Sequence, residues 1–380
     1  MPVLRLILWG VVFAAAADVC LAEPAVIEAS QAKADENGST LWYDARLLTI
    51  EGQGWSETKS DYDRLPSKAE ATVRKAVWNL SRHSAGIAVR FSTAASTIHA
   101  RWTLTSKSLA MPHMPATGVS GLDLYVRDSG GHWRWLANGR PSGQTTTAKL
   151  VAGLPQQQRE YLLYLPLYNG VTSVEIGIDK GQAIAASGDR PIGYEKPIVF
   201  YGTSITQGGC ASRPGMVHTA ILGRRFDRPV INLGFSGNGR METAVAELMA
   251  EIDAAVYVLD CLPNITAETV ATQTKPCVDI LRKAHPSTPI LFVEDRSYSD
   301  SFLVTSKQKR NHSSRAAYRK VFEELKAAGY EKIFYLEGEH LLGDDNEGTV
   351  DSSHPTDLGF MRQAEAFAEV LGPILMGKKQ

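Results

Sequence analysis

The chain has 380 residues, of which 44% are hydrophobic and 21% are charged, a composition typical of a globular protein. Its formal net charge is −1. This balance gives no reason to expect nucleic acid or an anionic membrane as a partner, and it leaves a neutral ligand such as a sugar open. The length favours two domains.

The first 22 residues predict a secretory signal peptide. Arg5 supplies a positive charge, residues 6–17 are apolar and rich in alanine, and residues 20–22 resemble a cleavage site. The apolar run is too short to cross a bilayer, although an uncleaved N-terminal anchor is the alternative. No other stretch is long and apolar enough to span a membrane. We therefore expect a secreted or periplasmic protein.

Cleavage after residue 22 leaves three cysteines, Cys210, Cys261 and Cys277. An odd number argues against a disulfide framework. A disulfide between Cys210 and Cys261 is possible in an oxidising compartment, but buried free thiols are slightly favoured. No Cys and His residues have the spacing of a structural zinc site.

Residues 23–185 predict an all-β domain. Apolar residues alternate with polar or small ones around residues 87–91, 98–104, 122–126 and 174–178, and Gly, Ser, Asp and Pro clusters separate these segments. Such a pattern is typical of antiparallel strands in a sandwich, and no long amphipathic helix interrupts it. We expect a jelly-roll-like sandwich.

The six tryptophans that follow the predicted signal peptide all lie in this half. Exposed aromatic rings on a sandwich can stack on sugars, although most tryptophans lie in a core or an interface. Trp102 belongs to an apolar alternation and is predicted to be core, whereas Trp133 and Trp135 share one strand face and could be either. The full set is Trp42, Trp55, Trp78, Trp102, Trp133 and Trp135.

Residues 186–380 predict an α/β domain. The pattern repeats strand and helix about five times, which favours a five-stranded parallel sheet with helices on both faces. The carboxyl ends of the strands then meet at one edge, where open α/β sheets bind ligands. Strands are expected at 198–201, 229–233, 255–260, 289–294 and 332–336, and helices at 214–226, 240–252, 267–284, 312–328 and 356–371.

Polar residues follow several of these strands. The buried run Ile198-Val199-Phe200 leads into a tight turn that carries Ser204, the next strand leads into a glycine-rich loop at 232–239, and the third leads into 260–264. Asp351-Ser-Ser-His354 lies just before the last predicted helix. The topology brings these segments to one edge.

Acyl transfer from a serine needs a base, a group that orients the base, and donors for the oxyanion. His354 is the candidate base, and Asp351 can reach its other ring nitrogen. The backbone amides of Ser204 and Gly234 and the side-chain amide of Asn264 are the candidate oxyanion donors. This chemistry needs no metal or cofactor.

These residues resemble the SGNH hydrolase superfamily, the GDSL-like esterases, in its form with an N-terminal β-sandwich. Ser204, Gly234, Asn264 and His354 match its four blocks in order, and Asp351-x-x-His354 matches the last block. Two positions depart from the pattern: Thr203 stands where many members carry Asp, and Asn264 lacks the usual Gly before it and Asp after it. The resemblance implies a flavodoxin-like hydrolase domain that acts on acetylated sugars, acyl lipids or thioesters.

Alternative readings apply to single residues. Asp351 or Ser353 could cap the last helix, and Asn79, Asn264 and Asn311 each lie in a glycosylation sequon. A glycan on Asn264 would be incompatible with an oxyanion role.

Arg213, Asn238 and Arg240 are candidate substrate-binding residues because they lie near the same edge. Arg213 and Arg240, and with them Glu294 and Arg296, are more often salt-bridged surface residues than substrate contacts.

We expect a secreted serine esterase whose substrate is a small-molecule or glycan ester, most plausibly an O-acetyl group on carbohydrate. A lipid acylhydrolase or thioesterase is the second reading, and a catalytically silent carbohydrate-binding protein is the third. The sandwich is expected to pack against the active edge and narrow it. The oligomeric state stays open.

Overall fold

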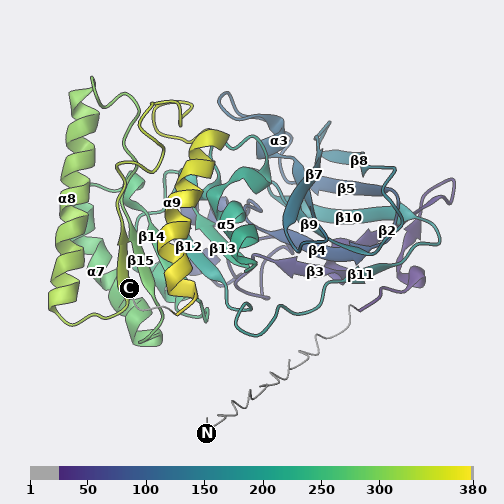
Figure 1. Cartoon of the computed structure of the whole chain (residues 1–380), viewed down its shortest axis with the longest axis horizontal. Coiled ribbons are helices and arrows are strands. Elements are labelled where there is room, and N and C mark those ends of the chain that lie inside the picture. The colour runs from purple at the N-terminus through teal and green to yellow at the C-terminus, as the bar shows by residue number, and fades with distance from the viewer. Residues whose placement is uncertain (1–24, 378–380) are drawn as a thin grey trace, which may run out of the picture.

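The computed structural model describes residues 25–377, so the predicted signal peptide lies outside the described residues. A β-sandwich and an α/β unit lie side by side, with the sandwich at the right of Figure 1 and the α/β unit at the left. The last sandwich strand ends at Ala186, and the first strand of the α/β unit begins at Ile198. No helix within the described residues is both long and apolar enough to cross a bilayer.

The sandwich consists of two antiparallel sheets within the described residues, as predicted. Along one strand the side chains of Ile98, Ala100, Trp102 and Leu104 are buried while those between them are half-buried, so one face packs into the core between the sheets. The first sheet has the order β1 (Lys33–Ala34), β2 (Thr40–Asp44), β10 (Val171–Asp179), β5 (Ile98–Leu104) and β8 (Thr145–Val151). The second sheet has the order β11 (Ile184–Ala186), β4 (Ala88–Thr93), β9 (Arg159–Tyr164), β6 (Leu122–Arg127) and β7 (Trp133–Gly139). A further strand, β3 (Thr49–Glu51), pairs with β4.

The tryptophans divide as the alternation suggests. Trp102 is fully buried, and its indole N–H donates to the carbonyl of Ser120 (3.1 Å). Trp133 is half-buried, whereas Trp135 keeps half of its surface exposed and donates to Asp123 Oδ1 (2.9 Å). The strand that carries both is thus partly open to solvent.

The α/β unit contains a parallel five-stranded sheet, which confirms the predicted flavodoxin-like fold. Its interior strand β12 (Ile198–Gly202) is buried along its whole length, as both faces of the sheet are covered. The strands lie in the order β13 (Val230–Gly234), β12 (Ile198–Gly202), β14 (Val256–Asp260), β15 (Ile290–Val293) and β16 (Ile333–Leu336).

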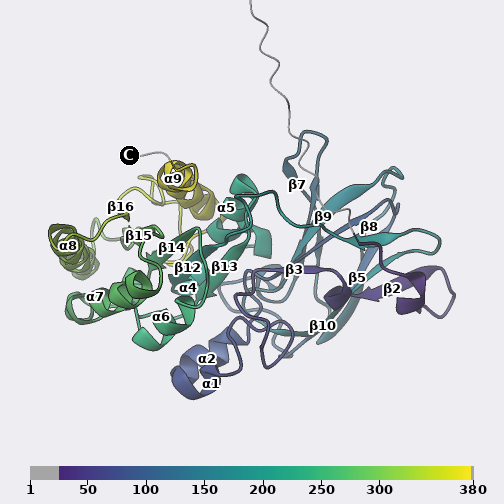
Figure 2. The same ribbon diagram turned by 90° about the horizontal axis from the view of Figure 1, so that it is seen from below.

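Helices cover both faces of this sheet (Figure 2). Ile198 and Phe200 pack with α5 and α9 on one face, and Val199 and Tyr201 pack with α6, α7 and α8 on the other. The helices are α4 (Ser204–Gln207), α5 (His218–Phe226), α6 (Thr243–Met249), α7 (Ala267–Ala284), α8 (Thr305–Ala327) and α9 (Asp357–Leu375), with short 3₁₀ turns η3 (Pro214–Met216) and η4 (Leu262–Asn264).

Several helix boundaries differ from the prediction, including the start of α6 at Thr243 and the end of α9 at Leu375. α8 begins seven residues early, at Thr305, because its first two turns are polar and carry no apolar periodicity. α5 begins at His218 because Pro214 starts a separate 3₁₀ turn. α6 ends at Met249, short of the predicted residue 252.

The connection from β3 to β4 was not predicted to be helical, and its two helices pack against the α/β unit. It forms α1 (Ala69–Thr72) and α2 (Lys75–Ser81), which lie beside α6 (Figure 2). Val77 and Trp78 share a core with Ile231 of β13. The two halves of the chain are therefore joined by a common core. The remaining short elements are η1 (Ala29–Gln31), η2 (Ala45–Leu47) and α3 (Ala116–Val119).

The three described cysteines are free and buried. Cys261 Sγ donates to the carbonyl of Tyr201 (3.5 Å) rather than pairing with Cys210. The structure therefore has the buried thiols of the favoured alternative and lacks the 210–261 disulfide.

Candidate active site

The turn that carries Ser204 is built by close packing at the end of β12. A Cβ on Gly202 would lie 2.0 Å from Thr206 Oγ1, so only glycine lets the chain turn there. Thr203 caps α4 by accepting a hydrogen bond from the backbone N–H of Ile205 (3.3 Å). Thr203, at the position where many members of the superfamily carry Asp, thus supplies the N-cap oxygen of α4.

The structure brings together the three residues predicted as a triad. Ser204 Oγ lies 2.8 Å from His354 Nε2, and His354 Nδ1 lies 2.8 Å from Asp351 Oδ2. The other carboxylate oxygen accepts the backbone N–H groups of Ser353 (3.1 Å) and His354 (2.8 Å). The arrangement matches a serine, its general base and the carboxylate that orients the base.

The charge state of Asp351 suits this arrangement. Partial burial alone would raise the pKa of Asp351, but the hydrogen bonds from His354 and Ser353 outweigh it and hold the pKa below its ordinary value. Asp351 does not cap the last helix, because Thr356 does so by accepting the N–H of Gly359 (3.3 Å).

Gly234 does not fit the oxyanion role predicted for it. Its N–H already donates to Asn232 Oδ1 (2.9 Å), and its carbonyl accepts from Arg64 (2.7 Å). A Cβ at Gly234 would lie 2.1 Å from the backbone nitrogen of Gln207. Gly234 is therefore a packing glycine that lets β13 approach α4.

Another glycine of the same loop fits the donor role better. Gly237 is exposed, has φ +66°, and its N–H donates to no group within the described chain. Gly239, by contrast, is packed: a Cβ there would lie 1.7 Å from the carbonyl of Gly202. The glycine-rich loop was visible in the sequence, but spacing alone could not show which amide is free.

Asn264 lies beside this loop. It ends η4, and its Nδ2 lies 3.5 Å from the carbonyl of Phe235, a weak contact that leaves the amide available to another acceptor. The N–H of Ser204 opens α4 and, like the first N–H groups of any helix, has no acceptor within that helix. Ser204, Gly237 and Asn264 are thus the donors that the structure leaves free.

The sandwich contributes side chains to the site, as its expected packing suggested. The imidazole of His113, from the loop before α3, lies 6.0 Å from that of His354, measured between ring centroids. Tyr168 donates its hydroxyl to the carbonyl of Ser204 (3.2 Å). The sequence offered no signal for either residue, because both come from loops of the other domain.

His83 supports the same region from the β3–β4 connection. Burial, with a smaller effect of the Arg64 charge, lowers the pKa of His83 to about 4. The ring is therefore neutral at pH 7, and its Nδ1 accepts a hydrogen bond from Gln207 Nε2 (3.0 Å). Gln207 Oε1 in turn accepts the N–H of Ser236 (3.0 Å), which fixes the loop before Gly237.

The three predicted substrate-binding residues have other partners. Arg213 is bound to the sandwich through Asp123 (2.7 Å) and Tyr125 (2.6 Å). Asn238 accepts from Arg74 (2.8 Å), and Arg240 donates to the carbonyl of Gly237 (3.0 Å). Arg213 is thus an interface residue, while Asn238 and Arg240 brace the glycine-rich loop.

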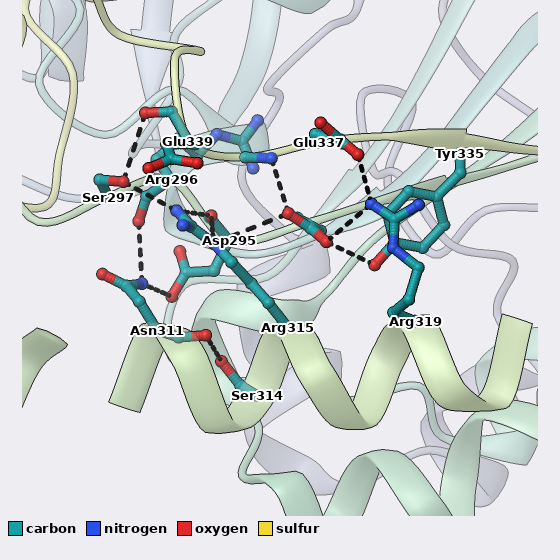
Figure 3. Close-up of polar contacts among 12 residues, drawn as sticks. Asp295, Arg296, Ser297, Asn311, Ser314, Arg315, Arg319, Tyr335, Glu337 and Glu339 are labelled. Carbon is teal, nitrogen blue, oxygen red and sulfur yellow. Dashed lines mark hydrogen bonds and ion pairs between the residues drawn. The ribbon is translucent and has the colours of Figure 1, made fainter. Parts of the chain in front are cut away.

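Glu294 and Arg296 are salt-bridged, but they are buried rather than at the surface. Arg296 pairs with the buried Asp260, which also accepts from Thr206 of α4 (2.9 Å). Figure 3 shows Arg315 and Arg319 reaching from α8 toward the segment that follows β15. It also shows Asn311 beside Asp295.

Asn311 is buried and donates to the carbonyl of Arg296 (3.1 Å), so its sequon is not accessible in the folded chain. Within residues 25–377, no three or more His, Cys, Asp or Glu side chains come together as a potential metal site.

Family models match most of the chain. A GDSL-like lipase/acylhydrolase family matches residues 195–372, and a family described as the N-terminus of SGNH-hydrolase-type esterases matches residues 40–184. The name of the second spells Gly-x-Asp-Leu-Tyr, which this chain carries at 121–125. Asp123 and Tyr125 of this motif are the residues that hold Arg213.

Solved structures share both halves. A protein described as a GDSL-like lipase from Bacteroides ovatus is 34% identical, with a TM-score of 0.84, over 89% of this chain and 98% of its own. The salicylyl acyltransferase SsfX3 of a tetracycline biosynthetic pathway is 20% identical (TM-score 0.68; 86% and 95% covered). The acetyl xylan esterase Est2A from Butyrivibrio proteoclasticus is 12% identical (TM-score 0.53; 89% and 99% covered). A comparison with curated proteins found no match. The 34% identity across nearly the whole chain shows that this protein belongs to the GDSL-like lipase/acylhydrolase family of SGNH hydrolases.

Proposed function

We propose that this protein is a secreted serine esterase that removes O-acetyl groups from carbohydrate. The observation that carries the proposal is the continuous chain of hydrogen-bond distances from Ser204 through His354 to Asp351, 2.8 Å at each step. A serine in this setting can lose its proton to the imidazole as it attacks a carbonyl. Export is proposed from residues 1–22 of the sequence.

The reaction proceeds in two halves. Ser204 Oγ attacks the ester carbonyl carbon while His354 Nε2 takes the hydroxyl proton, and the Asp351 carboxylate stabilises the imidazolium. The N–H groups of Ser204 and Gly237 and the Asn264 amide donate to the oxyanion. His354 returns the proton to the leaving alcohol, which yields the acyl-enzyme. It then deprotonates a water that attacks the acyl group, and Ser204 recovers its proton as the acid departs.

The surroundings of Ser204 support a small acyl group and a polar alcohol. Tyr168 donates to the carbonyl of Ser204 and His113 lies beside His354, so polar and aromatic groups come from the sandwich side, and Asp351 and His113 are exposed. Fold relatives support the same choice. The acetyl xylan esterase and a family two carbohydrate esterase from Cellvibrio japonicus (12% identical, TM-score 0.54) share the fold over most of this chain.

Hydrolysis of p-nitrophenyl acetate and longer acyl esters by the mature protein tests the proposal, followed by acetate release from acetylated xylan. We expect activity that is highest for acetate and falls by about 10³-fold or more in Ser204→Ala. Ser313→Ala, which alters an exposed serine of α8, is the matched control.

Each other outcome points to a different reading. Full activity in Ser204→Ala would exclude Ser204 as the nucleophile. Activity that rises with acyl length would favour a lipid acylhydrolase or thioesterase. Glycan binding without any ester hydrolysis would favour a silent carbohydrate-binding protein.

A further inference from the structure

The turn that joins Asp351 to His354 contains a residue in an unfavourable backbone conformation. Ser352 has φ +73°, in the left-handed region that residues other than glycine rarely adopt. This conformation lets the Asp351 carboxylate face both the backbone N–H and the ring of His354. Because a serine does not prefer it, neighbouring groups must hold the turn in place.

Those neighbours come from the segment before α8 and from its first turn. The N–H of Ser299 donates to the carbonyl of Ser352 (3.0 Å), and Lys307 Nζ donates to Ser352 Oγ (2.6 Å). The same ammonium binds Asp300 Oδ2 (2.5 Å). Ser299 Oγ lies 2.8 Å from Thr349 Oγ1, which ties the start of the catalytic loop to the same segment.

Lys307 forms an ion pair with Asp300 while it makes this contact. The hydrogen bond from Lys307 is the main reason that the pKa of Asp300 lies below its ordinary value, so the carboxylate is ionised at neutral pH. The side chains of Lys307 and Asp300 are 34% and 40% exposed. An ion pair this exposed adds little to global stability. The hydrogen bond from Lys307 to Ser352 is therefore the more consequential contact of this side chain.

We propose that Lys307 is a positioning residue for the triad: through Ser352 it holds the left-handed turn that sets Asp351 against His354. Lys307 does not touch the reacting atoms. The inference rests on the proposed Ser-His-Asp mechanism. It goes beyond that mechanism because it names what keeps an exposed, unfavourable turn in its productive geometry. A small displacement of a base from its nucleophile lowers the rate steeply.

A spectroscopic test needs no substrate. The proton on His354 Nδ1, held against the Asp351 carboxylate, should give a resonance far downfield of the amide region, identified by its loss in His354→Gln. We expect this resonance to be sharp in the native protein and broadened or lost through faster exchange in Lys307→Met. Lys309→Met is the matched control, because Lys309 is exposed on the same helix and has no hydrogen bond or ion pair within the described chain.

Kinetics then tests the consequence. Lys307→Met should lower kcat by about tenfold and leave KM within about twofold, with Lys307→Arg recovering part of the loss and Lys309→Met matching the native protein. In a Ser352→Gly background the effect of Lys307→Met should shrink below about twofold, because glycine adopts the left-handed turn without support.

Two results would overturn the positioning role: an unchanged His354 resonance in Lys307→Met, or an equal loss of kcat in the native and Ser352→Gly backgrounds. Failure of the proposed function looks different. In that case the native protein hydrolyses no ester, or Ser204→Ala keeps its activity, while the resonance still reports whether Lys307 holds the turn.

Discussion

Asn264 is the proposed oxyanion donor that can be removed without touching the backbone. Its amide makes only a 3.5 Å contact with the carbonyl of Phe235, so Asn264→Ala should leave the stability nearly unchanged. Loss of one oxyanion donor should lower kcat by about 100-fold or more while KM changes little. Steady-state kinetics with p-nitrophenyl acetate measures both, and the urea midpoint checks the fold.

Asn264→Asp is the companion variant for this prediction. It keeps the size of the side chain but places a negative charge beside the developing oxyanion, so it should lose at least as much activity as the alanine variant. A kcat close to the native value in either variant would remove Asn264 from the oxyanion site.

The sequence predicted the roles of residues that lie in short local motifs. It did not predict roles that depend on contacts with distant parts of the chain. Ser204 follows a buried strand, and Asp351 and His354 lie three residues apart in one turn, so sequence alone predicted their meeting. Gly234 was predicted as a free donor, but Asn232 accepts its N–H and Gln207 holds the loop before Gly237, and neither interaction is visible as a motif.

At the scale of elements, the β3–β4 connection joins the halves through one buried guanidinium. Arg64 donates to the carbonyls of His83 (2.8 Å), Leu80 (2.6 Å), Asn232 (3.0 Å) and Gly234 (2.7 Å). Burial lowers the pKa of Arg64 to about 9, which still leaves it charged at pH 7. The guanidinium thus fixes α2 and the end of β13 to each other.

Arg64→Met should destabilise the protein by about 3 kcal/mol or more, because buried carbonyls lose a charged donor. Lys68→Met is the control: Lys68 lies on the same connection, but its side chain is 60% exposed and pairs with Glu251 at the surface, so it should cost less than about 1 kcal/mol. Urea unfolding measures both. Equal costs for the two variants would contradict the role given to Arg64.

The regular elements of the α/β half followed from the sequence because each strand is a short apolar run and each long helix has an apolar stripe. The β3–β4 connection escaped prediction for a physical reason. α1 and α2 have four and seven residues, too few to establish a helical period, and their stability comes from the core shared with β13.

At the scale of the whole molecule, the two halves are also joined by a buried carboxylate. Asp123 of β6 accepts from Arg213 (2.7 Å), from the N–H of Gly215 (2.8 Å) and from Trp135 (2.9 Å). Burial raises the pKa of Asp123 even though the charge of Arg213 opposes this effect. The pair crosses from the sandwich to the segment that follows the Ser204 turn, so we expect the halves to unfold together.

Two signals, tryptophan fluorescence and ester hydrolysis, follow the halves in a urea titration. Trp42, Trp102, Trp133 and Trp135 report the sandwich, Trp55 and Trp78 pack against the α/β core and report the junction, and ester hydrolysis reports the active site. In the native protein both signals should change at the same urea concentration.

Asp123→Ala leaves Arg213 without its buried partner and should cost about 3 kcal/mol, with activity lost at lower urea than fluorescence. Asp253→Ala, which removes the surface partner of Lys196, should cost less than about 1 kcal/mol and keep the two transitions together. Separate transitions in the native protein would mean that the sandwich and the hydrolase half fold as independent units.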